Sequence, residues 1–222
     1  MHKSIKQIIM KILSFNVNND YRNTTKNATT IVDMISRIDP DIVGLQEVTP
    51  SMYDALENSL LFQRYNVSDK QPRSYFNVMI SKFPDDIVEI PFIKTSMSRS
   101  FLKQYVASLD HTFITTHLES VTQNRSVRSA QCQQMCSSLD GVPATVFGDT
   151  NFCSEDERMA DGMAYITPTS TTEFSYDYLL NPNAHPPFRT NLDRFYTNIP
   201  RPKVDILVDV TFSDHFPIMM TA

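Results

Sequence analysis

Several apolar runs of this sequence end in polar side chains of the kinds that bind metals and phosphates. In "ATVFGDTN" (144–151), Asp149 and Asn151 follow a run of small and apolar residues, and "DIVGLQEV" (41–48) carries Glu47 near its end. Comparable positions are taken by Asn16, His117, Asp193, Asp214 and His215. Carboxylate oxygens bind Mg²⁺, carboxylate and imidazole groups can activate water, and amide and imidazole groups can donate to phosphate oxygens. These residue types are the ones that metal-assisted phosphoryl chemistry requires.

Each of these residues alone also has a structural interpretation. An Asn or Asp after a strand usually forms a turn, a single His in an apolar run is usually a hydrogen-bonded core residue, and a Glu after a strand is usually solvated. Their number favours a shared site instead, because strand ends on one side of packed sheets converge in space.

The elements that would position these residues are regularly spaced. β-Branched and aromatic residues predict strands over 11–17, 41–48, 75–81, 86–92, 112–118, 144–149 and 192–198. Helices are predicted over 24–38, 50–61 and 124–139, the second with Thr49 as its N-cap and Pro50 in its first turn. This mixture predicts an α/β fold, with two packed sheets flanked by helices in one domain over residues 1–222.

Composition and missing motifs exclude several function classes. The net charge of −5 argues against a broadly basic nucleic-acid surface, although it allows a local cationic groove. No G-x-G-x-x-G, G-x-x-x-x-G-K-[ST] or G-x-S-x-G motif occurs, so dinucleotide, P-loop and nucleophile-elbow chemistry are excluded at the sequence level.

Cysteine usage and hydropathy predict an intracellular protein of the nucleus or cytoplasm. Three cysteines make no disulfide framework in 222 residues, and Cys132 and Cys136, one helical turn apart, are interpreted as packing residues. The N-terminal stretch is broken by Lys11 and is interpreted as the approach to a first strand, not as a signal peptide. No apolar run is long enough to span a membrane, so no membrane contact is expected.

Six motifs together resemble a known superfamily. "SFNVN", "LQEV", "THLES", "GDTN", "LDRF" and "SDHFP" follow each other in this order between residues 14 and 217. Their order and spacing resemble the endonuclease/exonuclease/phosphatase superfamily, with its DNase I-like fold, and within it the tyrosyl-DNA phosphodiesterases. "MSRSFLKQYV" (97–106) is similar to the same group. The resemblance covers essentially the whole chain and implies a four-layer α/β/β/α sandwich with the site at one edge of the sheets.

The resemblance also implies roles for the polar residues. Asp149 would activate and orient the attacking water, and Asn151 would hold the phosphate beside it. Glu47 would be the direct ligand of Mg²⁺, for which Mn²⁺ is an alternative. His215 would stabilise charge on the phosphoryl oxygens and would be oriented by Asp193.

Further positions are similar to binding positions of the family. Asp214 would share the orienting or the metal role, Asn16 and His117 would contact the phosphate, and Ser120 would line the same wall. Tyr176, in "EFSYDY", would form an aromatic wall where the relatives have tryptophan.

The chain departs from the family pattern at two positions. Asn18 stands where the pattern W-N-x-D has a carboxylate that helps to hold the metal's water shell, so weaker Mg²⁺ binding is expected unless Asp20 compensates. Cys153 stands where the tyrosyl-specific relatives have an arginine, so the phosphate clamp expected there is in doubt.

The expected activity is Mg²⁺-dependent hydrolysis of the 5′-phosphotyrosyl bond between a protein tyrosine and a DNA or RNA end, by a monomer. Single-stranded or frayed 5′ ends are the expected partners, and the cations that would contact them are Arg99, Lys103, Arg125 and Arg128. Two alternatives stay open. One is another hydrolase of the same fold, namely an abasic-site endonuclease, a phosphoinositide phosphatase or a sphingomyelinase. The other is a catalytically silent module that binds phosphorylated ends.

Overall fold

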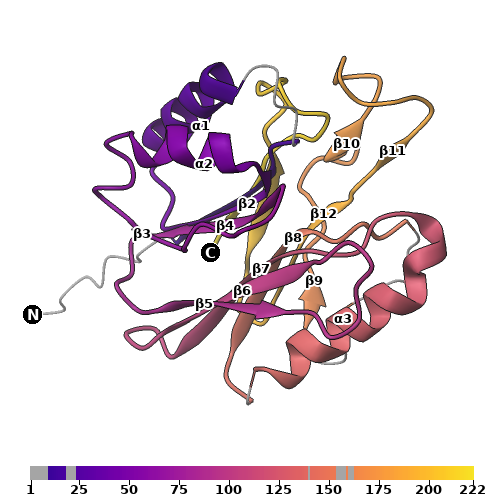
Figure 1. The fold of residues 1–222 in the computed structure, drawn as a ribbon. Coiled ribbons are helices and arrows are strands. Elements are labelled where there is room, and N and C mark those ends of the chain that lie inside the picture. Colours follow the sequence, from indigo (N-terminus) through magenta and orange to yellow (C-terminus); the bar gives the residue numbers. More distant parts are fainter. Residues whose placement is uncertain (1–9, 19–23, 140, 154–158, 160–162) are drawn as a thin grey trace, which may run out of the picture.

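The fold is two mixed β-sheets packed face to face, with helices on both outer faces (Figure 1). The computed structural model describes residues 10–18, 24–139, 141–153, 159 and 163–222. The arrangement confirms the predicted α/β/β/α sandwich. Asp20 lies outside the described residues, so the expectation attached to it has no structural counterpart.

Each sheet has six strands. The first sheet has the order β13 (Lys203–Ile206), β14 (Ile218–Thr221), β1 (Lys11–Asn16), β2 (Ile42–Val48), β4 (Phe76–Ser81), β3 (Asn66–Val67). The second has the order β5 (Ile87–Pro91), β6 (Ser100–Val106), β7 (His111–His117), β8 (Ala144–Asp149), β12 (Asp193–Thr197), β9 (Ala164–Tyr165). The pairs β1–β2 and β7–β8 are parallel, and the other neighbours are antiparallel. A separate ribbon pairs β10 (Tyr176–Asp177) with β11 (Arg189–Thr190).

The helices divide between the two outer faces. α1 (Thr24–Ile38) and α2 (Pro50–Glu57) cover the first sheet, and α3 (Arg125–Ser137), preceded by the short 3₁₀ helix η2 (Thr122–Asn124), covers the second (Figure 1). Within the described residues, none of these helices is long and apolar enough to cross a membrane.

Three apolar clusters connect the four layers. Ile31 and Ile35 of α1 pack on the first sheet, Phe113 and Phe147 lie between the sheets, and Met135 of α3 packs on the second sheet. Cys132 lies in the cluster under α3 and Cys136 packs against it, which confirms the interpretation of both as packing residues. Burial of these apolar faces fixes the two sheets against each other and therefore fixes where their strands end.

Most predicted elements are present, with some differences at their limits. Thr49 caps α2, since its Oγ1 accepts a hydrogen bond from the Met52 amide at 3.2 Å. The helix ends at Glu57 and not at residue 61. Asn58 is its C-cap, and the Asn58 backbone amide donates to the Asp54 carbonyl. Five strands of the two large sheets were not predicted from the sequence, namely β3, β6, β9, β13 and β14. In β6 the apolar Phe101 and Leu102 are adjacent and the polar Gln104 is buried, so the strand lacks the alternation of apolar and polar residues by which it could have been predicted.

Candidate active site

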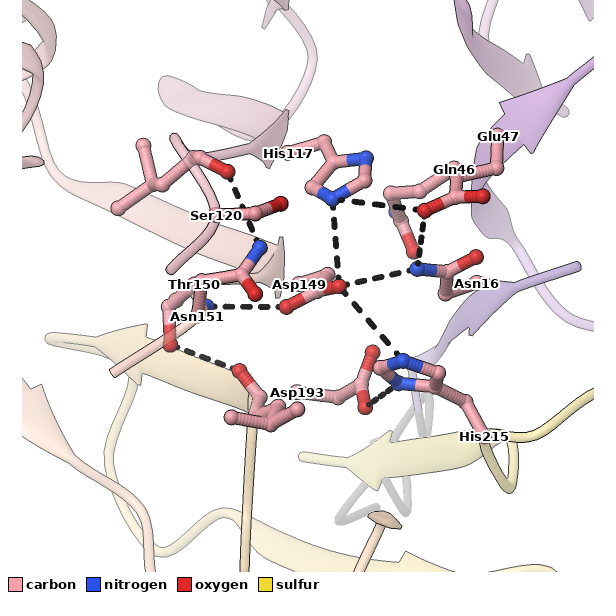
Figure 2. Close-up of polar contacts among 12 residues, drawn as sticks. Asn16, Gln46, Glu47, His117, Ser120, Asp149, Thr150, Asn151, Asp193 and His215 are labelled. Carbon is pink, nitrogen blue, oxygen red and sulfur yellow. Dashed lines mark hydrogen bonds and ion pairs between the residues drawn. The ribbon is translucent and has the colours of Figure 1, made fainter. Parts of the chain in front are cut away.

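Strand register brings the polar residues of the second sheet to one edge. His117 is the last residue of β7 and stands beside Asp149, the last residue of the parallel neighbour β8. On the other side of Asp149 stands Asp193, the first residue of the antiparallel neighbour β12. In the first sheet, β1 ends at Asn16 next to Gln46 of β2. The two sheets therefore present their polar ends to each other (Figure 2).

Asp149 is the centre of this cluster. Its Oδ2 accepts a hydrogen bond from Asn16 Nδ2 at 2.9 Å and lies 3.3 Å from His117 Nε2 and 3.8 Å from His215 Nε2. Its Oδ1 accepts from the backbone amide of Asn151 at 2.9 Å. Residues far apart in the sequence thus converge on one buried carboxylate (Figure 2).

The protonation of this centre follows from burial and neighbouring charges. Burial raises the pKa of Asp149 to about 6, against the lowering effect of the His215 charge and the Asn16 hydrogen bond. Burial alone would lower the pKa of His215, but the carboxylates of Asp193, Asp149 and Asp214 outweigh it and raise this pKa to about 10. A carboxylate that titrates near neutrality beside an imidazolium can exchange protons at physiological pH.

Asp193 and His215 form a tight pair. Asp193 Oδ2 lies 2.7 Å from His215 Nδ1, and the Asp193 amide donates to Ser175 Oγ at 3.0 Å. The ring of Tyr176 meets the His215 ring edge-on, with centroids 5.2 Å apart, and its hydroxyl accepts from the His185 amide. The imidazole is therefore held from both sides.

His117 occupies the opposite wall with Arg99 and Ser120. An Arg99 guanidinium nitrogen contacts His117 Nδ1, and the other donates to Ser120 Oγ at 3.0 Å. Burial, and then the charges of Arg99 and His215, hold the pKa of His117 well below its ordinary value. His117 is therefore neutral, whereas His215 is charged.

Glu47 reaches the cluster through an irregular strand. The pairing of β2 with β4 shifts register between Leu45 and Val48, and Glu47 has a positive φ of 61°. Its Oε1 accepts from Asn16 Nδ2 at 3.3 Å and lies 3.8 Å from His117 Nε2. Bulges of this kind re-aim a side chain, and positive φ at a non-glycine residue is concentrated at functional sites.

Asn18 and Asp214 form a second polar pair beside Asn16. Asn18 Nδ2 donates to Asp214 Oδ1 at 3.0 Å, and the Asn18 amide donates to Asn16 Oδ1 at 3.0 Å. Ser213, which sequence reasoning missed, connects this pair to the centre. Its hydroxyl donates to the Asn16 carbonyl at 2.7 Å and accepts from the His215 amide at 3.1 Å. The sequence signal that could have identified Ser213 is its position in "SDHFP", directly before Asp214 and His215.

The donor set fits a hard divalent cation. The carboxylates of Glu47 and Asp149 both face one amide nitrogen of Asn16, so two negative charges meet at one point of the site. Asp193 Oδ1 is buried and finds no hydrogen-bond partner among the described residues. Asp149 and Asp193 lie close together with His215, but His215 is charged and bonded to Asp193, so only the carboxylates of this group are candidate ligands. Oxygen-rich ligands of this kind suit Mg²⁺ or Mn²⁺.

Asn151 supports the same edge through its local conformation. Its φ is 50°, a left-handed conformation that asparagine tolerates, and its Nδ2 donates to the Leu118 carbonyl at 3.1 Å. Cys153 is exposed with its Sγ directed at the Asn151 carbonyl, so it provides no cation at this place.

Of the four cations predicted to contact nucleic acid, Arg128 is wrong as a surface cation, and Lys103 is half-buried and bound away from the site. Arg128 is fully buried and donates to the carbonyls of Glu119 and Val121, because it lies on the inner face of α3 with Cys132. Lys103 donates to the Ser138 carbonyl at the far end of α3. The role of Arg128 is therefore structural.

The other two cations lie near the site in different settings. Arg99 is only 5% exposed, in the wall described above. Arg125 is exposed in the first turn of α3, whose N-terminal side is tied to Ser120 by a hydrogen bond from Asn124 Nδ2 to the Ser120 carbonyl. Only Arg125 therefore keeps the character of a surface cation.

Gly148 fixes the position of Asp149, and its substitution has a testable cost. Its φ is +139°, and an added Cβ would lie 2.0 Å from the Thr116 carbonyl oxygen of the neighbouring strand. We expect Gly148→Ala to lower the free energy of unfolding by about 3 kcal/mol or more, measured by urea denaturation. Gly141→Ala is the matched control, since Gly141 also has positive φ (+77°) but no atom within 4 Å. A loss there of about 1–2 kcal/mol is expected. Equal losses at both positions would contradict the steric argument.

The two histidines of the site should have different protonation states near neutral pH. With EDTA present, NMR titration of the imidazole signals should show His215 charged and His117 neutral throughout pH 5–8. Because the folded pKa of His215 is raised, its stabilising effect is complete below about pH 6.5 and is lost as the pH rises towards 10. A His215 midpoint between pH 6 and 7 would contradict the proposed influence of the carboxylates.

Comparisons with known proteins agree with this architecture. The model of the Endonuclease/Exonuclease/phosphatase family matches residues 13–215. Tyrosyl-DNA phosphodiesterase 2 of Bos taurus is 24% identical over 204 residues, which are 82% of this chain and 55% of the relative. The 5′-tyrosyl-DNA phosphodiesterase of Caenorhabditis elegans is 24% identical over 228 residues, covering 93% of this chain and 62% of the relative. The chain thus spans little more than half the length of these curated relatives.

A solved structure shows the same fold. Danio rerio TDP2 complexed with single strand DNA product superposes with a TM-score of 0.83 at 20% identity, covering 96% of this chain and 98% of that one. The family match extends from β1 to His215 and so includes every strand end that forms the cluster. The chain therefore belongs to the Endonuclease/Exonuclease/phosphatase family.

Proposed function

We propose that this protein is a Mg²⁺-dependent phosphodiesterase that hydrolyses the 5′-phosphotyrosyl bond between a protein tyrosine and a DNA or RNA end, leaving a 5′-phosphate. The observation that carries the proposal is the convergence of Asn16, His117 and His215 on one oxygen of Asp149, with Glu47 beside it. The names of the relatives supply the substrate class.

Each residue has a role that follows from its contacts. Asp149, whose pKa is near 6, accepts a proton from the attacking water and orients it towards phosphorus. His215 carries a positive charge, is fixed by Asp193 and faces the same point, so it neutralises charge that develops on the phosphoryl oxygens. Asn16 and Asn151 hold the geometry through their hydrogen bonds to Asp149.

The metal would be held by Glu47, with Asp214 and Asn18 beside it. A divalent cation in this position supplies Lewis-acid stabilisation of the phosphoryl and leaving oxygens. Asn18 contributes an amide and not a charge, and it donates its hydrogen bond to Asp214. The pair thus keeps one carboxylate group beside the proposed metal position, which supports an active enzyme over a silent binding module.

The leaving group fits the residues present. A tyrosine phenol has a pKa of about 10, so its oxygen can depart as a phenolate without a dedicated general acid. The Tyr176 hydroxyl accepts a hydrogen bond from the His185 amide, which fixes this ring as a wall of the site. An unpaired base stacked on such an aromatic surface gains about 1–3 kcal/mol, which favours single-stranded or frayed ends.

The partners of the proposed enzyme follow from the same features. We infer that the chain acts as a monomer in the nucleus or cytoplasm and engages the 5′ end of a strand. Arg125 and Ser120 on one wall and Tyr176 on the other would border the strand. The net charge of −5 supports contact with a short end over contact with a long duplex.

A substrate panel tests this proposal. Purified protein with Mg²⁺ is incubated with a 5′-phosphotyrosyl oligonucleotide, abasic duplex DNA, an inositol phosphate and sphingomyelin, and initial rates are compared. We expect the tyrosyl adduct to be converted to a 5′-phosphate much faster than any other substrate reacts. An abasic duplex nicked at an equal rate would reduce the assignment to the family level.

A further inference from the structure

Arg99 is a buried cation with an unusual set of partners. Its guanidinium contacts His117 Nδ1, donates to Ser120 Oγ at 3.0 Å and to Met97 Sδ at 3.7 Å, and lies 5.3 Å from the centre of the Tyr75 ring. Among the described residues, no carboxylate lies within ion-pair distance of it, although its side chain is almost completely buried. A buried guanidinium without a carboxylate calls for a functional explanation.

The loop that carries Arg99 is firmly anchored. The Arg99 amide donates to Thr95 Oγ1 at 2.9 Å, and Thr95 Oγ1 donates to Glu119 Oε2 at 2.8 Å. Glu119 also accepts from the Ser96 amide at 2.9 Å and from Gln131 Nε2 of α3 at 3.1 Å. These bonds connect the loop to the end of β7 and to α3, so the guanidinium is held in a fixed place.

The contact with Arg99 determines which nitrogen of His117 carries the proton. A guanidinium has only donors, so the Nδ1 that it contacts must be the unprotonated acceptor. The neutral ring then carries its proton on Nε2. The other side of the ring is compatible with this tautomer, because Nε2 lies 3.3 Å from Asp149 Oδ2, an oxygen that can accept a hydrogen bond.

We propose that Arg99 is a positioning residue that fixes His117 in the Nε2–H tautomer, so that His117 acts in the site as a hydrogen-bond donor and not as a base. His117 then donates towards Asp149 and the phosphoryl oxygen that replaces water beside it. This assignment deepens the proposed function and rests on it for the identity of the phosphoryl group. It replaces the expectation, drawn from the sequence, that Arg99 contacts nucleic acid directly.

The test reads the tautomer directly and is independent of any substrate. The chain has five histidines, so long-range ¹H–¹⁵N correlation spectra of protein labelled with ¹⁵N-histidine can be assigned with the variant His117→Gln. We expect the wild-type protein to show His117 protonated on Nε2, with Mg²⁺ and with EDTA. A proton on Nδ1 would overturn the proposal, and this result requires no variant of Arg99.

Substitutions then connect Arg99 to the tautomer. Arg99→Met keeps the apolar stem and removes the donor, so the Nε2–H form of His117 should lose population and kcat should fall at least tenfold with a smaller change in KM. Arg99→Lys keeps a donor and should restore part of both. Arg64→Met, at an exposed arginine in the turn before β3, is the matched control and should change neither.

The alternative role of Arg99 gives a different pattern. If Arg99 contacts the phosphate directly, Arg99→Met raises KM and reduces the salt dependence of binding while the His117 tautomer stays unchanged, which would overturn the proposal. Failure of the proposed function is distinguishable from this outcome. In that case the tyrosyl substrate is not cleaved by wild-type protein, whereas the Nε2–H tautomer and its loss in Arg99→Met are still observed.

Discussion

Glu47→Gln is expected to lower the rate of phosphotyrosyl hydrolysis by on the order of 10²–10³. The change keeps the volume of the side chain and its hydrogen bond from Asn16, which is 3.3 Å long, but it removes the anionic oxygen that Mg²⁺ prefers. Initial rates at saturating substrate and a Mg²⁺ titration by calorimetry measure the two consequences. We expect the loss of rate to accompany a loss of Mg²⁺ affinity.

The control for this variant is a glutamate outside the site. Glu57→Gln, at the exposed end of α2, makes the same chemical change and should leave rate and Mg²⁺ affinity unaltered. In EDTA, Glu47→Gln should melt close to the wild-type temperature. Wild-type activity in the Glu47 variant, or in excess EDTA, would remove Glu47 from the metal site.

His215→Ala is expected to lower kcat by about 10³ while KM changes little. The charge on this imidazole is used mainly when negative charge develops on the phosphoryl oxygens, so its removal affects the transition state more than the bound substrate. Asp193→Asn should give a smaller loss of the same kind, about 10- to 100-fold, because it weakens the 2.7 Å contact that orients the ring.

Steady-state kinetics of both variants distinguish this role from a role in binding. Asp205→Asn, at an exposed position of β13, is the matched control for Asp193→Asn and should retain wild-type kinetics. A rise in KM as the main effect of either site variant would show that the pair binds substrate and does not stabilise the transition state.

The sequence predicted the sandwich and the strand ends because these depend on local patterns. The apolar run that ends in Asp149 gives β8, and helical spacing gives α1 with the predicted limits. The order of the motifs was enough to place His117 and Asp193 at the ends of strands, although their register against Asp149 is a property of the folded sheet.

Other features depend on tertiary structure and were beyond local reasoning. The bulge that directs the Glu47 side chain into the site arises from the pairing of β2 with β4. A glutamate gives no sequence signal for the positive φ that Glu47 adopts there. Arg128 was predicted to be a surface cation from its charge alone, without regard to which face of the helix it occupies. It lies four residues before Cys132 on α3, and this spacing places it on the buried face.

Crystals soaked with Mn²⁺ and a 5′-phosphorylated single-stranded oligonucleotide, the expected product, test the central claim most directly. Anomalous diffraction locates the cation without reference to activity. We predict a manganese peak at the Glu47 carboxylate and the 5′-phosphate between Asp149 and His215, with the strand passing Tyr176. A cation bound away from Glu47, or a terminal phosphate bound outside the edge formed by β1, β7, β8 and β12, would contradict the account.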